Sequence, residues 1–204
     1  MAKTDKEKFI QDILGYVEIY ALKYNVQVYS PILAQAILES ACGTSELAVN
    51  AKNYFGLKYR KNRCPTSNGT YNKIGSEQNS DGSYVSSNMK WFTFPSMEAC
   101  VIGYFDFTNI SNYNNLKGIT DPELYCKNLK IDQYATSLDY DTKLMNTIKA
   151  YDLTRFDPKP QTSEKLYRVQ VGAYKVKKNA ENMLAKLKAA GFNGFIVEVE
   201  TETK

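Results

Sequence analysis

The sequence of 204 residues contains no histidine. This absence excludes Ser-His-Asp triads, Cys-His pairs and histidine-ligated zinc, and with them the common cysteine peptidases and zinc hydrolases. The four cysteines (Cys42, Cys64, Cys100 and Cys126) form no C-x-x-C pair, so a structural zinc site is not expected either. Catalysis by this chain would therefore rest on carboxylates, hydroxyls, lysines or a bound cofactor. Of these we expect no cofactor, and we expect no metal.

Long apolar segments are missing as well. No run approaches the ~18 apolar residues of a membrane span, and the opening residues MAKTDKEKFIQD lack the apolar core of a secretory signal. The sequence thus predicts no membrane insertion and a cytoplasmic stage before release to the site of action. In that reducing compartment the cysteines would be free thiols.

Strong charge of either sign is also absent, because the formal net charge is only +4. Most of it belongs to the last 41 residues, in which 8 basic and 5 acidic groups give +3. Such a tail suits a weakly bound anionic partner such as cell wall, although a solvated lysine face explains it equally well. No stripe of alternating aromatic and basic residues is present, so we expect no nucleic-acid partner.

The composition changes sharply at FDPKPQTSE, residues 156–164, where two prolines and a polar run predict an extended linker. It separates a domain over 1–155 from a module over 165–204. Within the first domain, helical periodicity surrounds a Gly-, Ser- and Asn-rich region at 57–95 that contains the turn signal Asp81-Gly82. The order predicts an α+β domain in which a small β-lobe is inserted between helices.

In the tail the periodicity switches twice. Residues 166–174 alternate as in a strand, 178–190 have helical spacing, and 195–199 again read as a strand. The tail is therefore predicted to be a small βαβ module.

One carboxyl group stands alone in an apolar segment. Between Lys23 and Glu46 the only charged residue is Glu39, in the predicted helix PILAQAILESAC. Burial in such a helix disfavours the charged form and raises the pKa of a carboxyl group. An acid that stays protonated near neutral pH can cleave a glycosidic bond by general acid catalysis. A structural carboxyl group hydrogen-bonded to backbone is the alternative.

Two segments resemble a known family. QAILESACGTSELAVNAKNYFGLKY (35–59) and QYATSLDYDTKL (133–144) are similar to the motifs of the peptidoglycan N-acetylglucosaminidases of glycoside hydrolase family 73. The resemblance covers about residues 5–155 and implies a lysozyme-like helical catalytic domain with a β-lobe. It also implies cleavage of the β-1,4 bond after N-acetylglucosamine.

The same resemblance suggests roles for individual residues. Glu39 takes the position of the general acid, and Glu77 is the expected second acid in the β-lobe, with Asp81 as its rival. Tyr134 is expected to orient the acetamido group or the attacking water. Two positions depart from the family pattern: Cys42 stands where a tryptophan is usual, and Gln133 replaces a glycine.

Aromatic side chains stack well on sugar faces. The expected groove residues are Asn53, Tyr54, Phe55, Trp91 and Tyr113, for each of which core packing is the competing interpretation.

The tail resembles one half of a SPOR domain, a module that binds glycan strands of peptidoglycan. The segment YRVQVGAYKVKKNAENMLAKLKAAGFNGFIVEV carries this resemblance, and we expect Arg168, Gln170 and Tyr174 to contact the wall. Chains below ~40 residues seldom fold alone, and two strands cover a helix poorly. A second copy could complete the module, so we predict a homodimer through residues 165–200.

Together these observations predict a hydrolase of bacterial peptidoglycan, an endo-β-N-acetylglucosaminidase that resembles a phage endolysin or, alternatively, a bacterial autolysin. Two other functions stay open. A muramidase or lytic transglycosylase would cut on the other side of the disaccharide, and a non-catalytic glycan-binding protein would keep only the fold.

Overall fold

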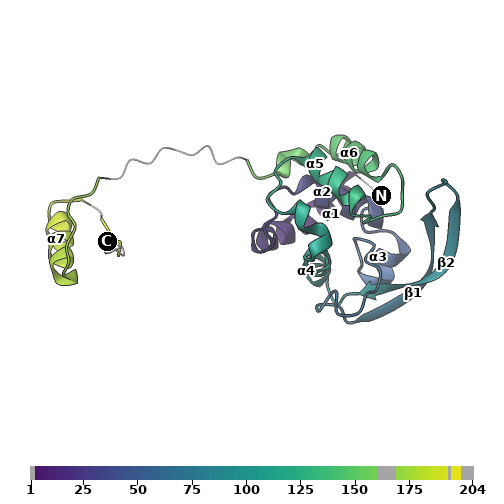
Figure 1. Ribbon diagram of the computed structural model, residues 1–204, viewed down its shortest axis with the longest axis horizontal. Coiled ribbons are helices and arrows are strands. Elements are labelled where there is room, and N and C mark those ends of the chain that lie inside the picture. Colours follow the sequence, from purple (N-terminus) through teal and green to yellow (C-terminus); the bar gives the residue numbers. More distant parts are fainter. Residues whose placement is uncertain (1–2, 160–168, 193, 199–204) are drawn as a thin grey trace. The chain divides into compact units, whose positions relative to one another are not determined.

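The computed structural model describes residues 3–159, 169–192 and 194–198, without the side chains of residues 3 and 4 (Figure 1). It divides the chain into two compact units, 1–159 and 160–204. Within the described part of the chain, no helix has the length and apolar character needed to cross a bilayer.

The N-terminal unit is the predicted α+β domain, a helical body with a β-lobe, and its chain order is confirmed. Its elements are α1 Lys3–Tyr20, η1 Ala21–Tyr24, α2 Ser30–Ser40, α3 Glu46–Ala51, β1 Gly69–Gln78, β2 Tyr84–Thr93, α4 Met97–Thr108, η2 Ser111–Leu116, α5 Pro122–Ile131, α6 Tyr140–Ala150 and η3 Leu153–Phe156.

Helix α2 forms the centre of the body, and it packs against α1, α5 and α6. Nine of its eleven residues are buried, which explains its almost uniformly apolar sequence. The helix ends where Ala41 and Cys42 adopt left-handed backbone angles, and the Ser40 hydroxyl accepts a hydrogen bond from the Gly43 N–H (2.7 Å). Cys42, which stands where the family usually has a tryptophan, is itself buried. The smaller side chain therefore packs within the core.

The β-lobe is a single antiparallel hairpin of β1 and β2, which lies along one side of the helical body beyond α3 (Figure 1). Near its base, the Tyr71 hydroxyl donates to Glu46 of α3 (2.9 Å), and Lys73 pairs with the same carboxylate (3.0 Å). Near its tip, the Gln78 N–H donates to the Thr136 hydroxyl (3.1 Å) and the Gln78 side chain accepts from the Leu138 N–H (3.2 Å). The hairpin is therefore fastened to the body at two places.

The predicted linker begins too early in the sequence. Phe156 ends η3 and packs against the core. Asp157 accepts hydrogen bonds from the backbone N–H groups of Tyr29 (2.7 Å) and Ser30 (2.6 Å), and from the Ser30 hydroxyl (2.7 Å). It thereby satisfies free N–H groups at the start of α2. The body therefore extends through Asp157, and residues 160–164 of the predicted linker lie outside the described residues.

Among the described residues of the C-terminal unit, the predicted helix is the only regular element, as α7 Lys177–Ala189. The described parts of the two predicted strands, 169–174 and 195–198, form no strand here, and the other residues of these predicted strands lie outside the described residues. A strand needs a neighbour that pairs its N–H and C=O groups. Apolar side chains from these segments are nevertheless open to solvent. The exposed fractions are 88% for Val169, 76% for Phe195 and 57% for Val197.

Candidate active site

Glu39 lies in the last turn of α2, where its side chain is only partly exposed. Its Oε1 accepts a hydrogen bond from the hydroxyl of Tyr140 (2.8 Å), which is the first residue of α6 and is buried. A single oxygen of the carboxyl group is thus held by a side chain that comes from 101 residues further along the chain.

Tyr140 is itself held by a buried polar chain. The Gln35 amide donates to the Tyr140 hydroxyl (3.2 Å), and the Tyr104 hydroxyl donates to the Gln35 carbonyl oxygen (2.7 Å). Gln35 stands one turn before Glu39 on α2, so this chain of hydrogen bonds links two residues of that helix to Tyr140 of α6 and Tyr104 of α4. Fully satisfied buried networks of this kind make a site rigid.

Burial raises the pKa of the Glu39 carboxyl group above its ordinary value, because the charged form loses its hydration. The Tyr140 hydrogen bond and the charge of Lys58 act in the opposite direction without cancelling the effect of burial. The pKa of Glu39 is therefore shifted in the direction that a general acid needs.

The loop of residues 53–58 closes over Glu39 because position 56 is glycine. Gly56 has φ +61°, and a Cβ at this position would lie 2.9 Å from Oε2 of Glu39. Asn53 fixes the loop from inside. Its amide donates to the carbonyl groups of Leu57 (3.0 Å) and Phe92 (2.9 Å), and its carbonyl oxygen accepts from the Leu57 N–H (2.9 Å).

Three of the expected groove residues are therefore core residues instead. Asn53 and Phe55 have exposed fractions of 0%, and that of Tyr113 is 5%. Phe55 stacks on Tyr104 with a centroid separation of 4.4 Å. These side chains cannot reach a substrate in this conformation, so the predicted sugar contacts of Asn53, Phe55 and Tyr113 were wrong. These polar and aromatic side chains instead pack and form hydrogen bonds inside the domain.

Tyr54, Trp91 and Tyr134 are partly exposed and stay candidates for substrate contact. The Tyr134 ring lies parallel to that of Tyr140 (6.1 Å, 13°), and its hydroxyl donates to the Phe55 carbonyl (2.8 Å). It therefore stands beside the residue that holds Glu39, and its role in orienting substrate or water stays a prediction.

Glu77 occupies β1, where it pairs with Val85 of β2, and it forms an ion pair with Lys58. The Lys58 ammonium group also lies over the Trp91 ring (5.8 Å to the centroid), and its charge lowers the pKa of Glu39. Lys58 thus interacts with both candidate acids.

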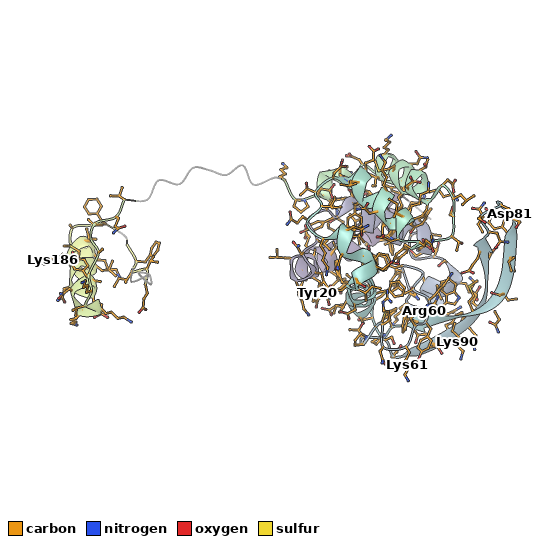
Figure 2. The ribbon with its side chains drawn as sticks, viewed as in Figure 1. Tyr20, Arg60, Lys61, Asp81, Lys90 and Lys186 are labelled. Carbon is orange, nitrogen blue, oxygen red and sulfur yellow. The ribbon has the colours of Figure 1, made fainter. Side chains whose placement is uncertain are left out.

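The rival second acid, Asp81, is engaged elsewhere. It lies at the outer end of the hairpin (Figure 2), where its carboxylate accepts hydrogen bonds from the Ser83 N–H (2.9 Å) and hydroxyl (2.6 Å). These bonds lower the pKa of Asp81 and fit a residue that stabilises the turn. The geometry therefore favours Glu77 over Asp81 as the second acid.

Sequence reasoning missed the roles of Gln35, Gly56, Lys58 and Tyr140. All four residues fall inside the two motif segments. The sequence signal that could have found them was their place in those segments. Their roles became visible only when the helices and the loop were brought together. For the tail, Arg168 lies outside the described residues, whereas Gln170 is exposed and Tyr174 has an exposed fraction of 40%.

Comparisons with known proteins identify the relatives of this chain. Residues 15–153 match the family model Glucosaminidase, described as mannosyl-glycoprotein endo-beta-N-acetylglucosaminidase, and residues 146–204 match the SPOR domain model. The exo-glucosaminidase LytG of Bacillus subtilis is 28% identical over 161 residues, covering 75% of this chain and 54% of the relative. The chain thus spans about half the length of this curated relative.

Solved structures show the same fold. The catalytic domain of the autolysin Auto from Listeria monocytogenes has 25% identity and a TM-score of 0.61, covering 77% of this chain and 90% of that one. A peptidoglycan hydrolase mutant from Sphingomonas sp. A1 has 22% identity and a TM-score of 0.63, covering 73% and 96%; it supports the fold alone. With the family model matching more than half of its length around Glu39, this chain belongs to the glucosaminidase family of glycoside hydrolases.

Proposed function

We propose that this protein is a peptidoglycan hydrolase, an endo-β-N-acetylglucosaminidase that cleaves the β-1,4 bond after N-acetylglucosamine. The observation that carries the proposal is the environment of Glu39, a partly buried carboxyl group with a raised pKa that one tyrosine holds by one oxygen. The family membership supports the choice of the glucosamine side.

In this proposal Glu39 protonates the glycosidic oxygen as the bond breaks. Because its Oε1 already accepts a hydrogen bond from Tyr140, the acidic proton belongs on Oε2, the oxygen that faces Gly56. Any side chain at position 56 would crowd that oxygen, so the geometry explains why both residues belong to one motif.

Glu77 supplies the second carboxylate, which stabilises positive charge on the sugar ring or activates water. Its side chain is 42% exposed and forms an ion pair with Lys58, whereas burial raises the pKa of Glu39. Two carboxyl groups in such different environments are the arrangement that acid–base hydrolysis requires.

Digestion of purified peptidoglycan, followed by identification of the new reducing-end sugar, tests this function. We expect N-acetylglucosamine ends and a mixture of long and short products. Muramic acid ends or 1,6-anhydro sugars would indicate a muramidase or lytic transglycosylase. Only short products released from chain ends would indicate an exo-acting enzyme, and no cleavage at all would indicate a glycan-binding protein.

The C-terminal unit is proposed to bind the wall and to form a homodimer through residues 165–200. Its match to the SPOR model supports the binding. The dimer is supported by the unpaired alternating segments, which expose Val171 (57%), Phe195 (76%) and Val197 (57%). Paired across a two-fold axis, such segments would form a sheet that covers α7.

Light scattering at micromolar concentration tests the dimer, which should have twice the chain mass of 23.2 kDa. A monomer mass would exclude it. In a separate assay, the full chain and a variant that ends at Lys159 are sedimented with purified walls. Equal sedimentation of the two would exclude a binding role for the tail.

A cytoplasmic stage before release to the wall belongs to the same proposal. All four cysteines are buried free thiols, which fits synthesis and storage in a reducing compartment. The phage origin stays a prediction. Fractionation of expressing cells should find the protein in the cytoplasm until the membrane is permeabilised.

A further inference from the structure

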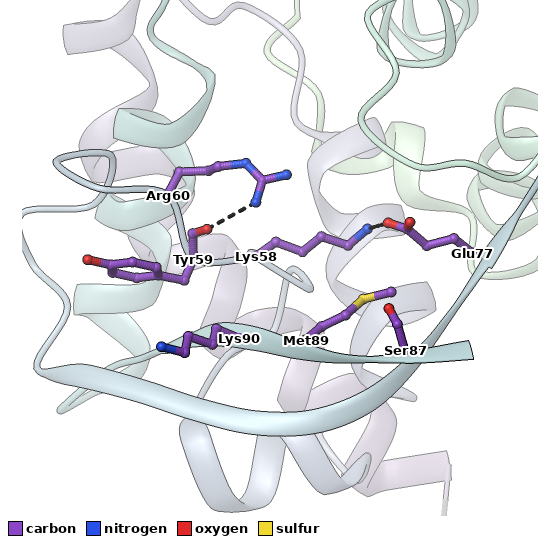
Figure 3. A pocket seen from close by; sticks show the side chains of 7 residues that line it. All are labelled: Lys58, Tyr59, Arg60, Glu77, Ser87, Met89 and Lys90. Carbon is purple, nitrogen blue, oxygen red and sulfur yellow. Dashed lines mark hydrogen bonds and ion pairs between the residues drawn. The ribbon is translucent and has the colours of Figure 1, made fainter. Parts of the chain in front are cut away.

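Beside the candidate active site there is a cavity of about 260 Å³ along the hairpin (Figure 3). Its lining includes Lys58 and Glu77, which it shares with the active site, and adds Arg60 and Lys90. Its volume is slightly below the range typical of ligand pockets, ~300–1,000 Å³. A cavity of this size can hold one branch of a substrate but is small for a whole ligand.

The charges that line this cavity do not balance. Three cations, Lys58, Arg60 and Lys90, line the cavity together with one carboxylate, Glu77, which is already paired with Lys58. Neither Arg60 nor Lys90 has an acidic partner among the described residues. The Arg60 Nη1 group donates a hydrogen bond to the Tyr59 carbonyl (3.1 Å), and the remaining guanidinium N–H groups are available for a ligand. The cavity is therefore an electropositive site with an exposed guanidinium group that has no acidic partner among the described residues.

The rim that presents Arg60 is well ordered by the sheet. The Tyr59 N–H donates to the Lys90 carbonyl (2.8 Å), and Lys58 forms a β-bridge with Trp91. Residues 58–60 thus run as a short extension beside β2. Figure 3 shows the Arg60 side chain reaching along the cavity toward the Lys58–Glu77 pair, whereas Lys90 points the other way. Arg60 is therefore the main candidate for binding an anion, and Lys90 adds to the positive potential.

We propose that Arg60, supported by Lys90, forms a subsite for a carboxylate on the peptide branch of peptidoglycan. This inference rests on the proposed function, because the glycan must lie between Glu39 and Glu77. Every second sugar of that glycan carries a lactyl-linked peptide, so a branch next to the cleaved bond lies within reach of a cavity that shares Glu77. The planar guanidinium fork matches a carboxylate by two parallel hydrogen bonds.

The subsite gives the enzyme a preference for glycan whose peptides carry free carboxylates over glycan whose peptides are amidated. A hydrogen bond to a charged group at a partly exposed site contributes about a ten-fold preference. The preference should decrease with ionic strength, because salt screens an exposed charge pair.

The test compares kcat/KM on soluble glycan–peptide fragments with free carboxylates and on the same fragments after carboxyl amidation. For the wild-type chain we expect a ratio of about ten, which Arg60→Gln lowers to below about two and Lys90→Gln lowers less. The matched control is Lys149→Gln, which removes one positive charge from an exposed residue of α6 outside the cavity and should keep the wild-type ratio.

Equal cleavage of the two substrates by the wild-type chain would overturn the subsite. So would the same decrease of the ratio in the Lys149 variant, because the preference would then follow net charge alone. Amidation could leave the rate unchanged while removal of phosphate polymers from the wall lowers it. That result would show that the site binds phosphate and would reject the carboxylate. Failure of the proposed function is distinct: the wild-type chain would then cleave neither fragment, or would leave muramic acid or 1,6-anhydro ends.

Discussion

The two sides of the candidate active site are built in opposite ways. On the helical side, Glu39 is partly buried and is tied through Tyr140 and Gln35 to the core. On the hairpin side, Glu77 lies on a two-stranded sheet with 42% of its side chain exposed, and a single flexible lysine pairs with it. The contrast separates two environments: burial raises the pKa of Glu39, as a general acid requires, whereas Glu77 is open to solvent and paired with a cation.

The largest effect is expected for Glu39→Gln, which removes the acidic proton and keeps almost the same volume. General acid catalysis contributes ~10²–10⁴-fold, so wall lysis by the purified variant should fall by about that factor. Turbidity loss of a wall suspension measures it. Retention of more than about a tenth of the wild-type rate would show that Glu39 is not the acid.

The stability of the same variant provides the control. The folded-state pKa of Glu39 is above its unfolded value, so its protonated form stabilises the fold below the unfolded pKa. That contribution is lost as pH rises through the folded pKa. Urea unfolding at acidic and neutral pH should therefore show that the Gln variant loses less stability on going to neutral pH than the wild-type chain does.

Glu77→Gln tests the hairpin side. We expect a loss of about 10²-fold, at the lower end of the general acid–base range, because an exposed carboxylate is replaced more easily by solvent. Asp81→Asn is the matched control on the same hairpin, and its activity should stay within about three-fold of wild type. A larger loss for Asp81→Asn than for Glu77→Gln would reverse the assignment of the second acid.

Gly56→Ala tests how closely the loop approaches the acid. The added Cβ would lie 2.9 Å from Oε2 of Glu39, and φ +61° is strained for alanine by roughly 1–2 kcal/mol. We expect about ten-fold lower activity and a lower midpoint of thermal unfolding. Gly82→Ala is the comparison, since its φ of +86° is also left-handed but no atom lies within 4 Å of the added Cβ. If both variants lose activity equally, backbone strain rather than contact with Glu39 is responsible.

The smallest effect is expected for Tyr140→Phe. Its hydroxyl lowers the pKa of Glu39, so its removal should move the alkaline limb of the kcat/KM profile to higher pH. The activity at the optimum should change by only a few-fold. A shift of that limb to lower pH would contradict the role assigned to this hydrogen bond.

Much of the fold could be predicted from local patterns. Apolar periodicity located the helices of the body, and Asp81-Gly82 located the turn of the hairpin. The prediction failed where a residue's role depends on distant partners. Asn53 and Phe55 carry the polar and aromatic character of a binding site, but their side chains turn into the core, and the periodicity of a short loop does not reveal that direction. The described tail segments form no strand for a related reason, since pairing is not a property of one segment.

The sequence by itself determined which chemistry is possible. Without histidine, and with one carboxyl group in an apolar helix, it pointed to carboxylate catalysis at Glu39 before any contact was known. The tertiary structure decided how that carboxyl group is controlled. Tyr140, Gln35 and the loop that carries Gly56 and Lys58 come from separate parts of the chain. Only folding brings the Tyr140 hydroxyl to one oxygen of Glu39, Gly56 to the other oxygen, and Lys58 between the two acids. Composition and spacing are local, whereas a pKa depends on every group that surrounds the carboxyl.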